Sequence, residues 1–250
     1  MHPILLKLGP ITLYTYGLML VVAFIVAAWL ASRAAQALPR GERAMTAEQT
    51  LDLACVSLLG GIVGARLLYA VLYFEAFAAA PLEFFAIWHG GLVWYGGFLG
   101  GLAAGVWYAR AKGFDALRAA DQLIPFVALG HALGRIGCFL NGCCYGDPTT
   151  AWCGVVFPGQ QQAVLPTQLF EALGLLAIYV VLRMLQRSLA LRARGRLLGW
   201  YLVSYGALRF GLEFLRGDQE PWWMGLTLQQ CISIGIVLAG AWLTRPRRRA

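Results

Sequence analysis

The chain has 250 residues, of which 60% are hydrophobic and only 13% are charged. This composition excludes an ordinary water-soluble domain and predicts an all-α integral membrane protein. The net charge of +8 would suit a nucleic-acid-binding protein, but the basic residues lie between apolar segments, as they do where they orient a membrane protein.

Seven apolar segments are each long enough to cross a bilayer as a helix, which takes about 20 residues. The first lacks the basic start of a cleavable export signal, so we expect it to remain in the protein. Together the segments predict a single seven-helix transmembrane domain over residues 1–250, with a small outward-facing segment around residues 141–165. The expected helices cover residues 11–32, 50–74, 90–110, 119–140, 166–187, 197–215 and 227–244.

Basic residues are distributed unevenly between the connections of these helices. Those after the first, third, fifth and seventh helices hold Arg33, Arg40, Arg43, Arg110, Lys112, Arg118, Arg187, Arg192, Arg194, Arg196, Arg245, Arg247, Arg248 and Arg249. The opposite-side segments hold only Lys7 and Arg216. The positive-inside rule therefore predicts an N-terminus outside and a C-terminus in the cytoplasm.

With this orientation, most polar side chains of the helices fall in the outer half of the membrane. They are Tyr16, Arg66, Tyr95, Arg135, Asn141, Glu171, Arg209, Glu213 and Arg216. Asp121 lies instead at the cytoplasmic start of the fourth helix, where we expect it to cap the helix or lie at the interface. A guanidinium at hydrocarbon depth costs about 3 kcal/mol or more, so it is normally paired or bound to an anion.

Arg135 and Arg209 differ in their local partners. Arg135 lies in an apolar run from Leu123 to Leu140 and has no carboxylate at helical spacing. Because the guanidinium fork matches phosphate oxygens, an outer-leaflet phospholipid head group is a natural ligand for it. Arg209 precedes Glu213 by four residues, so a purely structural ion pair explains these two residues equally well.

Glycines recur at four-residue spacing in two of the expected helices. Gly60 and Gly64 do so in the second helix, and Gly97, Gly101 and Gly105 in the third, which favours close packing of helix backbones in lipid. The pairs Gly90-Gly91 and Gly96-Gly97 bracket residues 92–95 near the outer boundary. Packing is the favoured interpretation there too, although these glycines would also leave room for a ligand or expose backbone N–H groups.

Two histidines are candidates for proton transfer. His89 follows Trp88 at an aqueous boundary, where an interfacial role is the simpler explanation. His131 lies four residues before Arg135, and both a hydrogen bond within the bundle and a role at the site fit this position.

Four cysteines gather near the outer face: Cys138, Cys143, Cys144 and Cys153. Their spacing matches none of the usual zinc patterns, so no metal site is expected, and a disulfide from Cys153 to Cys143 or Cys144 is favoured over zinc. Cys55 and Cys231 fall inside apolar runs and are expected to pack as small apolar residues.

The sequence resembles the prolipoprotein diacylglyceryl transferase family over nearly its whole length. The motifs that carry the resemblance are LGPITLYTYGLML, GGIVGARLLYAVLY, WHGGLVWYGGFLGG, LGRIGCFLNGCCYG, LPTQLFEALG and YGALRFGLEFLRGD, in this order. The resemblance implies a multi-pass enzyme of the bacterial inner membrane with seven spans and no cofactor. Such an enzyme moves diacylglycerol from phosphatidylglycerol to the lipobox cysteine thiol of a preprolipoprotein and releases glycerol phosphate.

The resemblance also implies roles for individual residues. Arg135 matches the arginine of the family's Gly-Arg motif, which binds phosphatidylglycerol, and Arg209 matches the essential arginine of the sixth helix. Tyr16, Asn141, Glu213 and Arg216 match family positions as well. The expected catalytic residues are Arg135, Arg209, Tyr95 and Glu213. The expected substrate-binding residues are Arg135, Tyr16, Arg66, Asn141, Gly96, Gly97, Arg216, Glu171 and His89.

Three positions depart from the family pattern. Tyr95 replaces a histidine, Cys138 replaces an asparagine and Cys143 replaces a glutamate. A tyrosine base needs nearby arginines to favour its ionised form, so Tyr95, His89, solvent and the lipid phosphate all remain candidates to accept the thiol proton. The arginines are expected to stabilise the negative charge that develops on the departing glycerol phosphate.

Two other classes of protein fit parts of the pattern. A phospholipid-binding or anion-transporting protein would use the same arginines without covalent chemistry, but equivalent halves with broken helices are not evident. An outward-facing thiol redox protein would use the four outer cysteines, although adjacent cysteines seldom form a dithiol pair without strain.

Overall fold

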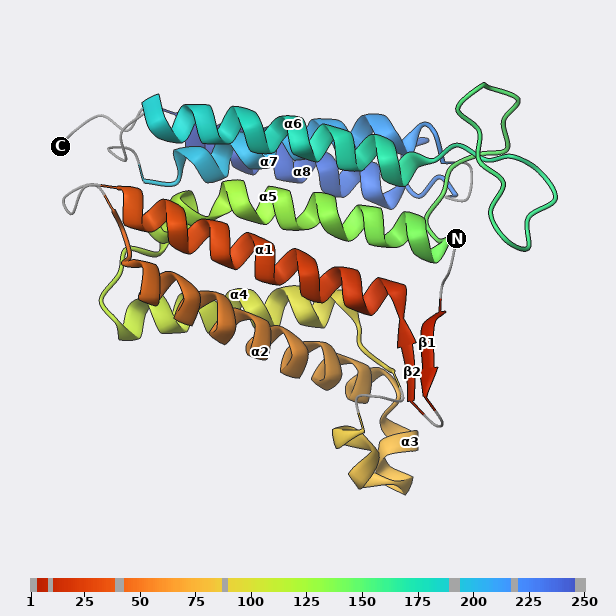
Figure 1. The fold of residues 1–250 in the computed structure, drawn as a ribbon, viewed down its shortest axis with the longest axis horizontal. Coiled ribbons are helices and arrows are strands. Elements are labelled where there is room, and N and C mark those ends of the chain that lie inside the picture. The colour runs from red at the N-terminus through yellow and green to blue at the C-terminus, as the bar shows by residue number, and fades with distance from the viewer. Residues whose placement is uncertain are drawn as a thin grey trace. The chain divides into compact units, whose positions relative to one another are not determined.

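The structure is a computed structural model that describes residues 4–8, 11–38, 43–86, 90–188, 194–216 and 220–245. Seven helices occupy the predicted positions, which confirms the helical assignment (Figure 1). They are α1 (Thr15–Ala37), α2 (Ala47–Leu72), α4 (Trp94–Ala111), α5 (Ala116–Asn141), α6 (Thr167–Ser188), α7 (Arg196–Glu213) and α8 (Leu228–Thr244). Of the described helices, α1, α2, α5 and α6 are long and apolar enough to cross a membrane, and α8 is a shorter apolar helix.

The first helix begins at Thr15, four residues after the predicted start at residue 11. Residues 11–14 form strand β2 (Ile11–Tyr14), which pairs antiparallel with β1 (Ile4–Leu8). Pairing with β1 satisfies the backbone groups of this segment as a helix would, and β-branched residues such as Ile11 favour the extended form. The structure also adds a short helix α3 (Phe74–Ala79) and a 3₁₀ turn η1 (Pro81–Phe85) after α2.

Local sequence signals explain where two of the helices begin. Thr46 caps α2, because its side chain accepts a hydrogen bond from the backbone N–H of Gln49 at 3.2 Å while Gln49 reaches back to the N–H of Thr46 at 2.8 Å. Thr227 and Gln230 repeat the same reciprocal arrangement at the start of α8. The Thr-x-x-Gln spacing therefore fixes both helix starts.

The chain divides into two compact units, which are described separately: residues 32–119, and residues 1–31 together with 120–250. In the first unit, α2 packs on α4 through glycines. A side-chain carbon added to Gly64 would clash with the carbonyl oxygen of Gly96, and one added to Gly60 would lie 2.9 Å from the carbonyl oxygen of Gly100. The structure thus confirms the predicted packing role of Gly60 and Gly64.

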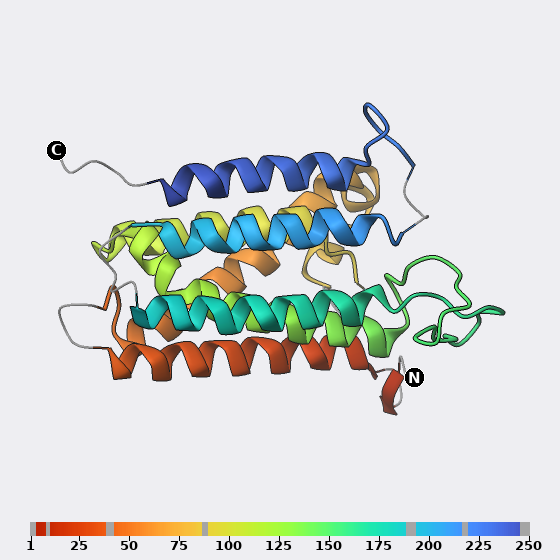
Figure 2. The same cartoon turned by 90° about the horizontal axis from the view of Figure 1, so that it is seen from above.

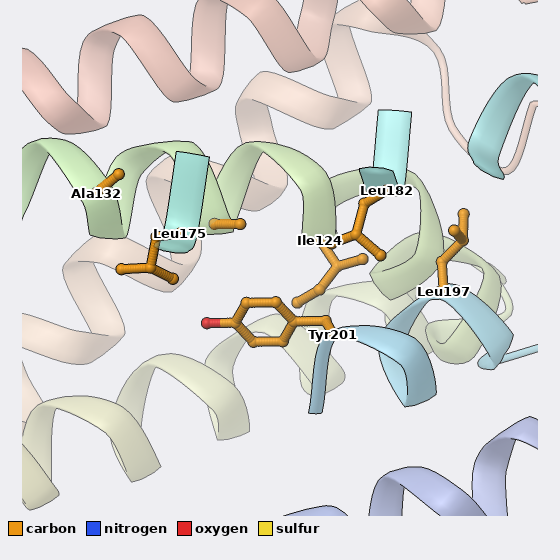
Figure 3. Close-up of a cluster of buried hydrophobic side chains, with 7 residues drawn as sticks. Ile124, Ala132, Leu175, Leu182, Leu197 and Tyr201 are labelled. Atoms are coloured by element: carbon orange, nitrogen blue, oxygen red, sulfur yellow. The ribbon is translucent and has the colours of Figure 1, made fainter. Parts of the chain in front are cut away.

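The second unit is built on α5, α6, α7 and α8, with α6, α7 and α8 side by side (Figures 1 and 2). Its apolar core lies where α5, α6 and α7 meet (Figure 3). The labelled core residues are Ile124, Ala132, Leu175, Leu182, Leu197 and Tyr201. Helix α1 packs on α5, since a side-chain carbon on Gly137 would lie 2.9 Å from Cβ of Met19.

The connection from α5 to α6 folds back on itself as a loop. Backbone hydrogen bonds join its two sides, among them Thr149 N–H to the Ala163 carbonyl at 2.8 Å and Leu165 N–H to the Asp147 carbonyl at 2.9 Å. Phe157 is fully buried and its ring stacks on Tyr145. The loop is therefore an ordered part of the second unit, next to the end of α5.

Candidate active site

The carboxylate of Glu171 on α6 is the centre of a buried polar network. Arg135 on α5 forms an ion pair with it, with 2.9 Å between Nη2 and Oε1. The hydroxyl of Tyr205 on α7 donates a hydrogen bond to the same oxygen at 3.2 Å, and Nε2 of His131 lies 3.7 Å from it. Three helices thus converge on one carboxylate.

The structure gives Arg135 a counter-charge that helical spacing could not indicate. The partner is Glu171, which comes from another helix and is only 4% exposed. The Nε atom of Arg135 is nevertheless buried and has no hydrogen-bond partner among the described residues. Arg135 is therefore held in place on one side and keeps an unused donor on the other.

Arg209 forms the expected ion pair with Glu213 on α7, at 2.8 Å. The second oxygen of Glu213 accepts a hydrogen bond from the hydroxyl of Thr227 at 2.8 Å. Because Thr227 also caps α8, the Glu213 carboxylate joins the end of α7 to the start of α8. The structure confirms the pair predicted from the four-residue spacing.

The two ion pairs belong to one cluster. Both guanidinium groups, of Arg135 and Arg209, lie close enough to His131 and Tyr205 to act on them electrostatically. The rings of His131 and Tyr205 are in edge contact, with 5.0 Å between their centroids. We call the group the polar cluster; its members are His131, Arg135, Glu171, Tyr205, Arg209 and Glu213. Its two cations and two anions make it formally neutral.

Beyond Arg135, the end of α5 leads into a turn that brings three thiols together. The sulfur atoms of Cys138, Cys143 and Cys144 all lie within 4.8 Å of one another. The first turn of α6 holds this segment, because Thr167 donates to the Cys144 carbonyl at 3.0 Å and Gln168 to the Cys143 carbonyl at 2.6 Å. We call these three residues the thiol cluster.

The charge environment of Cys144 favours its thiolate. A hydrogen bond from the Cys138 thiol lowers the pKa of Cys144 to about 5, against the opposing effect of burial. The cations of Arg135 and Arg216 lower this pKa further. The predicted site residue Arg216 therefore lies within electrostatic reach of the thiol cluster.

The expected disulfide from Cys153 is wrong in this structure. All six cysteines lie in the described part of the chain, and all six are free. Cys153 follows the turn by nine residues and is no member of the thiol cluster, whose third thiol is Cys138 instead. The end of α5 thus contributes the third thiol of the cluster.

Tyr16 and Asn141 also lie near this end of α5. A side-chain carbon added to Gly137, two residues beyond Arg135, would lie 3.5 Å from the Tyr16 ring. Asn141 is the last residue of α5, and its side chain hydrogen-bonds to the Cys143 thiol. The second unit thus brings most of the predicted site residues to neighbouring helix ends.

The other predicted residues lie in the first unit. The buried guanidinium of Arg66 donates to the carbonyl oxygens of Phe84 at 2.9 Å and Gly90 at 2.6 Å, and also to those of Glu83 and Gly91. Gly96 is buried against Gly64, Gly97 makes an ordinary contact with Ala65, and Tyr95 is half exposed. His89 lies outside the described residues. A substrate-binding role for these residues stays a prediction.

Sequence reasoning missed three polar residues of the site. Tyr205 was identifiable, because it precedes Arg209 by four residues and shares its helix face. Thr227 also carried a signal, the Thr-x-x-Gln capping pattern. Gln168 carried none, since its partner is a backbone carbonyl 25 residues earlier in the chain.

Comparison with known proteins agrees with this geometry. Residues 3–245 match the family described as prolipoprotein diacylglyceryl transferase. Similar relatives named phosphatidylglycerol–prolipoprotein diacylglyceryl transferase occur in Methylibium petroleiphilum (38% identity over 98% of this chain and 97% of the relative) and Vibrio atlanticus (35%, over 95% and 88%). Another, from Pseudoalteromonas atlantica, is 34% identical over 99% of this chain and 91% of its own length. The chain therefore belongs to the prolipoprotein diacylglyceryl transferase family.

Proposed function

We propose that this protein transfers the diacylglyceryl group of phosphatidylglycerol to the lipobox cysteine thiol of preprolipoproteins. In this reaction a carbon–sulfur bond forms at the glycerol carbon that carries the phosphate, and the carbon–oxygen bond to the phosphate breaks. The thiol loses its proton, and glycerol phosphate leaves with the bonding electrons. The protein must therefore stabilise negative charge on a phosphate oxygen.

The observation that carries the proposal is the pair of anchored guanidinium groups in the polar cluster. Glu171 and Glu213 each fix one arginine, so neither side chain has to be ordered when the lipid arrives. Donors held in advance in a site of low dielectric constant stabilise developing charge without reorganisation. The unused Nε donor of Arg135 is the group we assign to a phosphate oxygen of the lipid.

The polar cluster carries no net charge, and this determines how it attracts the phosphate group of the lipid. Because each arginine is balanced by a carboxylate, the cluster attracts an anion through directed N–H donors rather than through an excess of positive charge. Arg216, which follows α7, adds a cation near the thiol cluster. We assign Arg135 and Arg209 to the leaving phosphate and Arg216, Tyr16 and Asn141 to substrate binding.

The membrane arrangement belongs to the same proposal. We infer that α1, α2 and α4 to α8 all cross the bacterial inner membrane, with the N-terminus outside and the C-terminus in the cytoplasm. Under this topology the polar cluster and the loop between α5 and α6 belong to the outer half of the protein. That location suits a reaction on the lipobox cysteine of exported preprolipoproteins. Tyr95 and His89 remain candidates for the proton acceptor.

The test uses the purified protein in detergent, phosphatidylglycerol and a lipobox peptide whose mass is followed over time. We expect the peptide to gain one diacylglyceryl unit, and Arg135→Ala to abolish the gain. Arg110→Ala, which removes an exposed arginine at the end of α4, is the matched control and should retain full activity. A protein that binds the lipid but leaves the peptide mass unchanged would be a lipid-binding or transport protein, and the proposal would be rejected.

A further inference from the structure

The thiol cluster is not used by the proposed reaction. Cys138 belongs to the last turn of α5, Cys143 and Cys144 follow that helix, and the three sulfur atoms lie within 4.8 Å of one another. The sulfur atoms of Cys143 and Cys144 are 3.6 Å apart. Three thiols at this separation share one small volume at the surface of the second unit, where Cys144 is exposed and Cys138 is buried.

The backbone holds the thiols in this arrangement. Gly142 reverses the chain with a φ of 76°, and the N–H of Cys143 bonds back to the Cys138 carbonyl at 3.2 Å. Cys144 itself has a φ of 64°, a left-handed backbone conformation that residues other than glycine seldom adopt. The hydrogen bonds from Thr167 and Gln168 to the two cysteine carbonyls fix the turn from the side of α6. Backbone contacts therefore hold the turn that brings the three cysteines together.

The donor set selects a class of ligand. Thiolates are soft ligands, which bind Zn²⁺ or Cu⁺ and discriminate against Mg²⁺ and Ca²⁺. Around a tetrahedral zinc ion with Zn–S bonds of about 2.3 Å, the sulfur atoms lie about 3.8 Å apart. The observed separations, 3.6 Å between Cys143 and Cys144 and at most 4.8 Å for any pair, bracket this value. Three protein ligands leave one of the four positions of a tetrahedral ion for a water molecule or another ligand.

We propose that Cys138, Cys143 and Cys144 form a binding site for one thiophilic divalent cation of the Zn²⁺ type. Three thiolates and one divalent cation carry a net charge of −1, and the cation of Arg216, which lies within electrostatic reach of Cys144, opposes this charge. Arg135 lies three residues before Cys138, one helical turn away on α5. A bound ion would tie the end of α5 to the turn that follows it, directly beside the polar cluster.

The usual alternative for clustered thiols is a disulfide, which joins only two of the three, so a bond from Cys138 to Cys143 or Cys144 leaves one thiol unused. The adjacent residues Cys143 and Cys144 can be joined only with strain. The third thiol, Cys138, would be left without a role. A metal ion uses all three.

The experiment measures metal binding and needs no enzyme activity, so its result is independent of the transferase proposal. Reduced, chelator-treated protein without a histidine tag is titrated with Co²⁺ in detergent, and the sulfur-to-cobalt charge-transfer absorption is recorded. Zn²⁺ is then added to displace the cobalt, and bound zinc is quantified. We expect one ion per chain and strong charge-transfer absorption that zinc removes.

Two variants and a control make the result specific. Cys144→Ser should weaken Co²⁺ binding at least tenfold while the protein still elutes as the wild type does, and the triple serine variant of the thiol cluster should lose binding. Cys153→Ser removes a nearby thiol outside the cluster and should bind as the wild type does. Absence of charge-transfer absorption in the wild type, or unchanged zinc content in a triple variant that elutes normally, would overturn the proposal.

Discussion

Replacing Glu171 by Gln tests the centre of the polar cluster. The amide keeps the size of the side chain and one oxygen that accepts a hydrogen bond from Tyr205 or Arg135, but it removes the negative charge. The guanidinium of Arg135, whose side chain is 19% exposed, would then remain in place without its counter-charge. We therefore expect the folded protein to be less stable.

The size of the effect follows from the contacts. The Gln amide still accepts a hydrogen bond from the charged guanidinium, so what is lost is the attraction between the two charges, which contributes about 0.2–1 kcal/mol in a fully exposed pair. Removing one partner of a fully buried ion pair costs about 3–5 kcal/mol. The partial exposure of Arg135 places this pair below that range. We expect a loss of roughly 2–3 kcal/mol.

The assay is thermal unfolding of the purified protein in detergent without added phospholipid. Glu75→Gln, which changes an exposed carboxylate on α3, is the control and should unfold with the wild type. The double variant Arg135→Met/Glu171→Gln leaves no unpaired charge. Its loss of stability should therefore be smaller, by at least about 1 kcal/mol, than the summed losses of the two single variants. Wild-type stability of Glu171→Gln would refute the reasoning.

Three further predictions rest on other parts of the fold. Gly64→Ala should sharply reduce the yield of folded protein, because the added methyl meets the α4 backbone, whereas Gly235→Ala, which has open space, should fold normally. Thr227→Val should cost about 1–2 kcal/mol through the lost cap and the lost bond to Glu213, and Thr227→Ser should restore most of it in the same unfolding assay. In chelator-treated protein, iodoacetamide should alkylate Cys144 at a rate that is constant above the pKa of Cys144 and falls as the pH drops through about 5, because the thiolate is protonated below that pH. A rate that still rises above pH 8 would contradict this prediction.

The sequence predicts the helices well because each consists of a long apolar run. The β1–β2 hairpin escapes this reasoning, since residues 11–14 are as apolar as the helix that follows them. What makes them a strand is backbone pairing with residues 4–8, and no local pattern reports such pairing.

The polar cluster is predictable only where its partners share a helix. Arg209 and Glu213 are four residues apart, so helical geometry brings them together. Arg135 and Glu171 lie on different helices, and only the packing of α5 against α6 and α7 makes them partners. The sequence indicates four cysteines near the outer face but not which three meet, because that depends on the turn at Gly142, which reverses the chain and brings Cys143 back toward Cys138.

Arg66 has a consequence for the chain between α2 and α4. The last carbonyl groups of the 3₁₀ turn η1 and those just before α4 have few partners within a helix, and in an apolar surrounding each would be costly to leave bare. A single guanidinium, with several N–H groups in one plane, binds those of Glu83, Phe84, Gly90 and Gly91. The arginine thus substitutes for water of hydration, and it lets an irregular stretch of backbone persist where solvent is scarce.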